Sequence, residues 1–178
     1  IVPFFVLAFY LPGFYGDLTA LILFIVASFT DFLDGMLARM LGEESKLGEL
    51  LDPIADKIIV ATALILLVMD GTIRHYEVIA AIIILTREIL ISGLREFLAK
   101  GKIKLPVSNL AKLKTVLQMV SIALLLSGDT RNKIINFQDY NAQTIGIILL
   151  WLSAFLTLFT GYDYMRKGID HAMSEDNK

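Results

Sequence analysis

The sequence predicts an all-α integral membrane protein, a bundle of six transmembrane helices that forms a single domain over residues 1–178. Three observations predict this fold class. Of the 178 residues, 56% are hydrophobic, whereas a soluble domain is roughly 45–50% apolar. The mean hydropathy is +0.69. Apolar runs of about 20 residues, the length needed to cross the hydrocarbon core of a bilayer, recur along the whole chain.

The spans are separated by turn-forming or charged residues. After a first apolar run at residues 1–11, the expected spans cover about residues 18–41, 48–69, 76–99, 106–126 and 142–164. The first run is too short to cross a core of about 30 Å at 1.5 Å per residue. Because the chain also begins at Ile1, we expect the first helix to be N-terminally truncated. The polar tail, about residues 166–178, is expected to fray.

Local signals set the ends of these spans. Leu11-Pro12-Gly13 and Asp70-Gly71 are turn sequences. Pro53 falls in the first turns of the third span, where its missing N–H is tolerated best. The other boundaries are polar or basic loops at residues 42–47, 100–104 and 127–141.

Lysine and arginine are distributed unevenly between the two sides of the predicted bundle. One side carries Arg39, Lys46, Lys100, Lys102, Lys104, Arg166, Lys167 and Lys178. The other side carries Arg74, Arg131 and Lys133. Because basic loops stay in the cytoplasm, the first side is expected to face the cytoplasm. The net charge of −2 and the absence of cysteine give no support to nucleic-acid binding, a disulfide framework or a thiolate metal site.

Four aspartates gather at the cytoplasmic ends of the second and third spans. Asp31 and Asp34 are spaced i, i+3, and Asp52 and Asp56 are spaced i, i+4, so each pair shares a helix face. If the two helices are adjacent and antiparallel, all four carboxylates can converge. Unpaired carboxylates in an apolar setting repel one another and are costly to desolvate. One or two divalent cations would remove that cost, and oxygen ligands favour Mg²⁺, Mn²⁺ or Ca²⁺ over zinc.

Two glycines and an arginine accompany the aspartates. Gly35 and Gly48 allow either a close approach of a ligand to the backbone or close packing of helices. Arg39 suits either a phosphate or aspartate partner, or a cytoplasmic anchor. An ion or proton pathway would also use the acids, but it gives the glycines and Arg39 no role. A solvated acidic loop is the remaining alternative.

A second cluster is basic and lies within the fourth and fifth spans: Arg87, Arg95, Lys112 and Lys114. Arg87 and Arg95 are eight residues apart and share a helix face. Charges inside spans usually face an interior cavity, where arginine and lysine would hold a phosphate-bearing acceptor. Alternatively, the lysines extend to the membrane surface and the arginines pair with Glu88 and Glu96.

The aspartate segment resembles the signature of the CDP-alcohol phosphatidyltransferase family. The pattern is D-x-x-D-G-x-x-A-R, eight residues, then G-x-x-x-D-x-x-x-D. Every fixed position is present: Asp31, Asp34, Gly35, Ala38, Arg39, Gly48, Asp52 and Asp56. This number of matches within 26 residues is a specific signal, unlike a lone glycine motif.

The resemblance implies an enzyme in which a CDP-linked lipid or alcohol loses CMP to an acceptor hydroxyl. It implies a metal site, with Mg²⁺ or Mn²⁺ and two ions, at Asp31, Asp34, Asp52 and Asp56. It implies that Asp56 is the general base. The implied CDP-binding residues are Asp31, Asp34, Gly35, Ala38, Arg39, Gly48 and Asp52. It also implies a homodimer in the lipid bilayer.

Two further segments, Thr86–Glu96 and Val107–Thr115, resemble the bacterial branch of the family that makes phosphatidylglycerophosphate. They imply CDP-diacylglycerol and glycerol 3-phosphate as substrates, with the acceptor phosphate held by Arg87, Arg95, Lys112 and Lys114. They also imply the bacterial inner membrane as the location. One departure is Ala111, where that branch usually has glycine. The alternatives are a relative that uses inositol phosphate, serine, choline or phosphatidylglycerol, a cation or proton transporter, and a structural membrane subunit.

Overall fold

The computed structural model describes the backbone of residues 1–41, 46–100, 109–127 and 142–175, and their side chains except at 31–41, 46–53, 55, 56, 99, 100, 163, 167 and 169–175. Within these ranges the chain forms helices and no strands. The helices are α1 (Val2–Phe9), α2 (Phe14–Leu41), α3 (Lys46–Met69), α4 (Glu77–Lys100), α5 (Asn109–Leu126) and α7 (Ala142–Glu175). The predicted all-α fold class is therefore confirmed.

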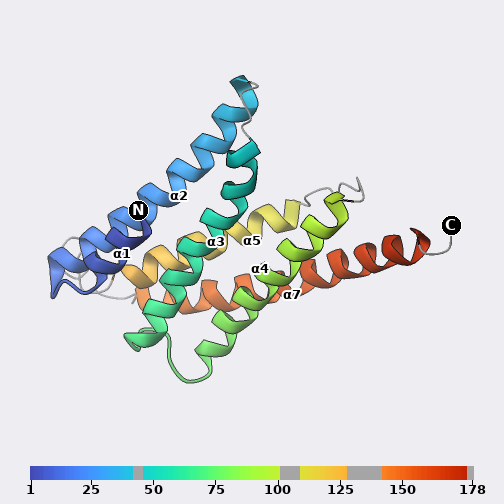
Figure 1. Ribbon diagram of the computed structural model, residues 1–178. Coiled ribbons are helices and arrows are strands. Elements are labelled where there is room, and N and C mark those ends of the chain that lie inside the picture. Colours follow the sequence, from blue (N-terminus) through green and yellow to red (C-terminus); the bar gives the residue numbers. More distant parts are fainter. Residues whose placement is uncertain (42–45, 101–108, 128–141, 176–178) are drawn as a thin grey trace.

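The helices alternate in direction along the chain (Figure 1). α2 and α3 form an antiparallel pair, and α7 packs most extensively on α5 and α4. The predicted turns are present, since Gly13 and Gly71 have φ values of 78° and 81°, which L side chains rarely adopt. Consequently the carboxyl ends of α2, α4 and α7 and the amino ends of α3 and α5 belong to one side of the bundle.

The last helix differs from its prediction. The sequence predicted a span that ends near Tyr164 and a frayed tail, but α7 continues to Glu175. The prediction of fraying was wrong for residues 166–175 because a polar composition does not itself end a helix, and this stretch contains no proline. Gly168 lies against α4 within it, where an added Cβ would be 2.9 Å from Leu94 Cδ2.

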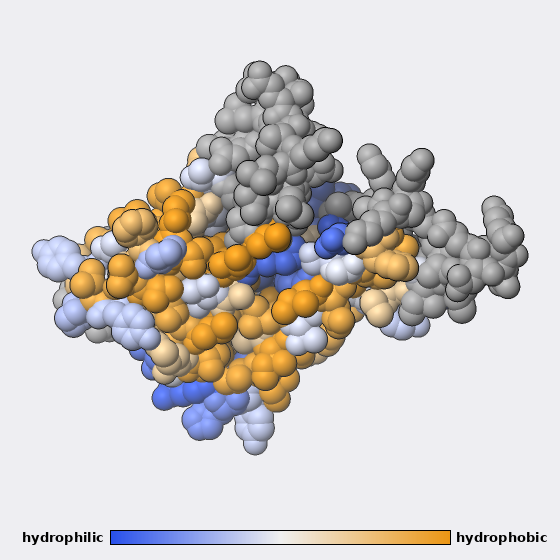
Figure 2. Space-filling model, viewed as in Figure 1, coloured by the Kyte–Doolittle hydropathy of each residue, from blue (hydrophilic) through white to orange (hydrophobic). Residues whose placement is uncertain are grey.

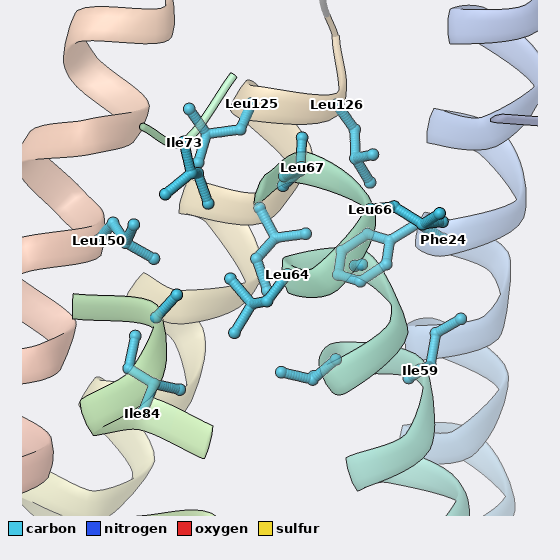
Figure 3. Close-up of a cluster of buried hydrophobic side chains, with 14 of the residues drawn as sticks. Phe24, Ile59, Leu64, Leu66, Leu67, Ile73, Ile84, Leu125, Leu126 and Leu150 are labelled. Atoms are coloured by element: carbon cyan, nitrogen blue, oxygen red, sulfur yellow. The ribbon is translucent and has the colours of Figure 1, made fainter. Parts of the chain in front are cut away.

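The hydrophobic core lies where all the longer helices meet (Figure 3). Leu64 and Leu67 of α3 are at its centre, and neither is more than 1% exposed. Each of the other helices contributes buried apolar side chains, among them Phe5, Phe24, Ile84, Ile122, Leu125 and Leu150. The core therefore fixes α3, which carries half of the aspartate signature, against the rest of the bundle.

The outer surface is largely apolar (Figure 2). Many large hydrophobic side chains are exposed on it, for example Ile82, Phe155 and Phe159. Two helical stretches in the described part of the chain, Asn109–Leu126 and Ala142–Arg166, are long and apolar enough to cross a membrane. Within the described side chains, α2 and α3 also contain apolar stretches, Phe14–Thr30 and Lys57–Met69. A largely apolar exterior is the pattern of a helical membrane protein.

A small residue lets α5 and α7 approach closely. Ser121 Oγ donates a 2.7 Å hydrogen bond to the carbonyl oxygen of Gly146. A Cβ added to Gly146 would lie 2.8 Å from Leu125 Cδ2, so a side chain there would force the two helices apart. Small residues at contacts of this kind stabilise helix pairs in membranes, where apolar burial alone gives little preference.

We predict that Gly146→Leu destabilises the protein by about 1–3 kcal/mol, because overpacking displaces neighbouring side chains. The measurement is the midpoint of thermal unfolding in detergent. Gly93→Leu is the matched control, since nothing lies within 4 Å of a Cβ at that exposed position. Equal midpoints for the two variants would contradict the close packing of α5 on α7.

Candidate functional site

The aspartate signature lies on two helices that pack together. Positions 31–39 are in the last turns of α2, and positions 48–56 are in the first turns of α3. The two helices are in contact and antiparallel, which is the arrangement that convergence of the acids requires. The side chains themselves lie outside the described residues: Asp31, Asp34, Gly35, Ala38, Arg39, Gly48, Asp52 and Asp56. Their roles as metal ligands, CDP contacts and base therefore stay predictions.

Among the side chains that the structure describes, no group of three or more His, Cys, Asp or Glu residues could hold a metal ion. That search does not include the four signature aspartates. The donor set of the signature is suited to a hard divalent cation, because it consists of carboxylate oxygens from two packed helices.

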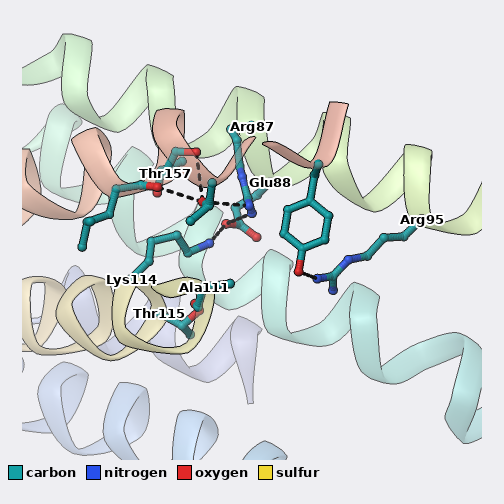
Figure 4. A network of polar contacts seen from close by, with 10 residues as sticks. Arg87, Glu88, Arg95, Ala111, Lys114, Thr115 and Thr157 are labelled. Atoms are coloured by element: carbon teal, nitrogen blue, oxygen red, sulfur yellow. Dashed lines mark hydrogen bonds and ion pairs between the residues drawn. The ribbon is translucent and has the colours of Figure 1, made fainter. Parts of the chain in front are cut away.

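Two of the predicted basic residues converge on one carboxylate (Figure 4). Arg87 Nη1 lies 3.4 Å from Glu88 Oε1, and Lys114 Nζ of α5 donates a hydrogen bond to the same oxygen. Arg87 and Lys114 are only 9% and 4% exposed. The three residues form an ion-paired triad in which the Glu88 side chain is partly exposed, at 20%. Cationic groups in such a site can bind an anion, and the ion pairs keep them in place when no anion is bound.

The helix α7 holds Arg87 from the other side. Arg87 Nη2 donates a 3.1 Å hydrogen bond to Thr160 Oγ1, whose own hydroxyl donates to the carbonyl oxygen of Leu156 at 2.8 Å. A Cβ on Gly161 would lie 3.1 Å from Arg87 Cγ. Gly161 therefore gives the arginine stem room to pass along α7.

Arg87 and Arg95 share a second partner on α7, the phenol of Tyr164. Arg95 Nη2 donates a 3.0 Å hydrogen bond to Tyr164 Oη, and its Cζ lies 4.9 Å from the ring centroid. The Cζ atom of Arg87 lies 5.8 Å from the same centroid. Tyr164 is 4% exposed, so it is a fixed wall between the two guanidinium groups, each at cation–π distance.

The predicted basic set is thus only partly brought together. Lys112 is exposed, whereas Lys114 is buried, because residues two apart point about 200° apart around a helix. Ala111, the departure noted in the sequence, is buried beside Ile91 and Tyr164. Its methyl group lies where α5 packs against Tyr164, the residue that accepts a hydrogen bond from Arg95.

Sequence reasoning did not find Thr160, Gly161 and Tyr164. A signal for them was present, since Thr157, Thr160, Gly161, Tyr164 and Gly168 are polar or small residues that recur at helical spacing in the last span. Their significance depends on α7 packing against α4, which hydropathy does not reveal.

A cavity of about 300 Å³ lies between α3, α4 and α5, and Glu88 and Lys114 of the triad line it. Its α3 wall includes Ile54, Lys57 and Ala61, and so spans the helical turn in which Asp56 occurs. Most of the wall is apolar, but several polar side chains line it: Lys57, Glu88, Ser92, Lys114, Thr115 and Gln118. An apolar cavity with a few convergent polar groups is typical of a site for a small ligand.

The sequence matches the CDP-alcohol phosphatidyltransferase family over residues 1–159. It is similar to proteins named CDP-diacylglycerol–glycerol-3-phosphate 3-phosphatidyltransferase from several bacteria. The relative from Rickettsia bellii is 41% identical over 165 residues, which cover 93% of this chain and 87% of that protein. The relative from Yersinia enterocolitica is 38% identical over 171 residues, 93% of this chain and 86% of the relative.

The relative from Cereibacter sphaeroides is 36% identical over 190 residues, 90% of this chain and 86% of that protein. The family match covers most of the chain, including both helices of the aspartate signature and the helices of the basic cluster. The chain belongs to the CDP-alcohol phosphatidyltransferase family.

Proposed function

We propose that this transferase moves the phosphatidyl group of CDP-diacylglycerol to sn-glycerol 3-phosphate, giving phosphatidylglycerophosphate and CMP in phospholipid biosynthesis. The observation that carries the proposal is the ion-paired cluster of Arg87, Lys114 and Glu88, whose two cations are buried, at the wall of a cavity that adjoins the signature helix α3. This cluster suits an acceptor that carries its own phosphate. The names of the relatives agree with that acceptor.

In the proposed reaction, the 1-hydroxyl oxygen of glycerol 3-phosphate forms a bond with the β-phosphorus of CDP-diacylglycerol. The bond between that phosphorus and the bridging oxygen breaks, and CMP leaves with the electron pair. Asp56 accepts the proton of the attacking hydroxyl. Arg87, Arg95, Lys112 and Lys114 are the proposed ligands of the acceptor phosphate. Holding the phosphate restricts the hydroxyl to the neighbourhood of α3, which lowers the entropic part of the barrier.

The four signature aspartates, Asp31, Asp34, Asp52 and Asp56, are proposed to hold Mg²⁺ or Mn²⁺, as two ions. When bound, the cations neutralise charge on the pyrophosphate as the P–O bond breaks. The CDP moiety is proposed to contact the same stretch of the two helices, at Asp31, Asp34, Gly35, Ala38, Arg39, Gly48 and Asp52.

The distribution of lysine and arginine supports an orientation with this site at the cytoplasmic side of a bacterial inner membrane. The acyl chains of the donor would remain in the bilayer, against the apolar exterior. A homodimer is proposed from family resemblance alone.

We predict CMP release by the purified full chain in detergent with CDP-diacylglycerol, Mg²⁺ and glycerol 3-phosphate. Inositol phosphate and serine, offered separately, are expected to give none. EDTA should abolish release and excess Mg²⁺ should restore it. CMP release with a different acceptor would contradict the proposal that the basic cluster holds the phosphate of glycerol 3-phosphate. It would still support a CDP-alcohol phosphatidyltransferase reaction. Ion flux in proteoliposomes without CMP release would instead favour a transporter.

Replacement of the proposed base should affect turnover far more than substrate binding. We predict that Asp56→Asn lowers kcat by about 10²–10⁴-fold, the usual contribution of a general base. Asp70→Asn is the matched control, because Asp70 lies in the exposed turn between α3 and α4 and accepts a hydrogen bond from Thr72. Near-normal turnover by Asp56→Asn would refute the assignment.

The buried lysine should govern acceptor affinity. We predict that Lys114→Met raises the KM for glycerol 3-phosphate by roughly 10–100-fold, the loss expected for one charge-assisted contact, and leaves the KM for CDP-diacylglycerol nearly unchanged. Lys112→Met, on the exposed face, should raise the acceptor KM less, and Arg74→Met at the opposite side should have no effect. Equal increases in both substrates' KM values for Lys114→Met would argue against an acceptor site.

A further inference from the structure

The cavity contains a buried polar atom whose hydrogen-bonding capacity is not used. Gln118 lines the cavity and is 3% exposed, and its Oε1 atom has no hydrogen-bond partner. Buried polar atoms nearly always have partners, because leaving one unpaired in an apolar interior is unfavourable. A side chain of this kind in the wall of a ligand-sized cavity indicates that a ligand supplies the missing donor.

The position of Gln118 relative to the basic cluster indicates which part of a ligand it would meet. Gln118 is four residues after Lys114 on α5, so the two side chains lie on one helix face about 6 Å apart along the axis. α5 runs inward from the side that holds the signature, which places Gln118 one turn deeper than Lys114. A small phosphate ester bound at Lys114 would extend its carbon chain along that distance.

A hydroxyl or amine group of a ligand can supply the donor that Gln118 Oε1 lacks. Apolar neighbours on the cavity wall, Ile58 and Met119 among them, supply none. In glycerol 3-phosphate the phosphate is on one terminal carbon and the attacking hydroxyl is on the other. The 2-hydroxyl is the group that has no role in the proposed chemistry.

We infer that Gln118 is a specificity residue whose Oε1 accepts a hydrogen bond from the 2-hydroxyl of the acceptor. This inference rests on the proposed function, since it takes glycerol 3-phosphate as the ligand of Lys114 and Arg87. A site built to hydrogen-bond a hydroxyl discriminates strongly against the analogue that lacks it, because the polar atom of the protein is then left unpaired. Gln118 would therefore select for polyol phosphates.

The test compares glycerol 3-phosphate with 3-hydroxypropyl phosphate, which keeps the phosphate and the attacking hydroxyl but lacks the 2-hydroxyl. The wild-type enzyme should prefer glycerol 3-phosphate in kcat/KM by roughly 10–100-fold or more, as measured by CMP release. In Gln118→Met, which is similar in size and apolar, kcat/KM for glycerol 3-phosphate should fall by that factor. Activity with the deoxy analogue should change little, so the preference should fall to about 1.

Gln143→Met is the matched glutamine control, because Gln143 donates to the carbonyl oxygen of Thr72 outside the cavity. It should leave the preference at its wild-type value, whatever its effect on stability. Gln118→Asn, which keeps an amide oxygen, should restore part of the preference. If Gln118→Met does not fold, the wild-type preference and Gln118→Asn still test the inference.

The outcomes separate the inference from the function on which it rests. Wild-type turnover with glycerol 3-phosphate but no preference over the deoxy analogue would overturn the role of Gln118 and leave the function intact. Equal losses on both acceptors in Gln118→Met would do the same, since a purely structural role acts on both. No CMP release from wild-type protein with either acceptor would overturn the proposed function, and the inference with it.

Discussion

The contact on which the site depends is the pairing of Arg87 and Lys114 with Glu88. These charges lie among apolar helices in a membrane protein, where an isolated ion is very costly. Because the three groups come from α4 and α5, their pairing fixes the relative rotation of these two helices. The same contact keeps two buried cations in place. Stability in the absence of acceptor and the proposed binding of a phosphate therefore depend on one arrangement.

α7 also contacts Arg87 and Arg95, through hydrogen bonds and the ring of Tyr164. Thr160 and Tyr164 orient the two guanidinium groups, and Gly161 and Gly168 let α4 approach. Oriented arginines lose less freedom when they bind a phosphate, and they bind it in a fixed geometry. The length of α7 matters here, since its later turns carry the contacts to Arg95 and Leu94.

Hydropathy predicted the helices well because a segment that spans the bilayer must hydrogen-bond its own backbone polar groups, which an α-helix does. The predicted boundaries agree with the structure within a few residues at α2, α3, α4 and α5, as at Met69, where α3 ends. The aspartate spacing predicted convergence of the four carboxylates only on the condition of an adjacent, antiparallel pair of helices, and α2 and α3 form such a pair. The sequence did not reveal that α7 would hold Arg87 and Arg95, nor that Gln118 would be buried beside Lys114. Those facts depend on how the helices are rotated and packed, which periodicity alone leaves open.

Different helices are proposed to bind the donor and the acceptor, which has a consequence for acceptor specificity. The signature proposed to bind donor and metal is confined to α2 and α3, whereas the proposed acceptor cavity draws its polar wall mainly from α4 and α5. The cavity meets the signature at α3, near the turn that contains Asp56. Substitutions on α4 and α5 can therefore alter which acceptor is held without disturbing the groups proposed to act on the pyrophosphate. In this arrangement, the residues proposed to recognise the acceptor differ from the residue proposed to activate its hydroxyl. Gln118 of α5 is among the residues proposed for recognition, whereas Asp56 of α3 is proposed for activation.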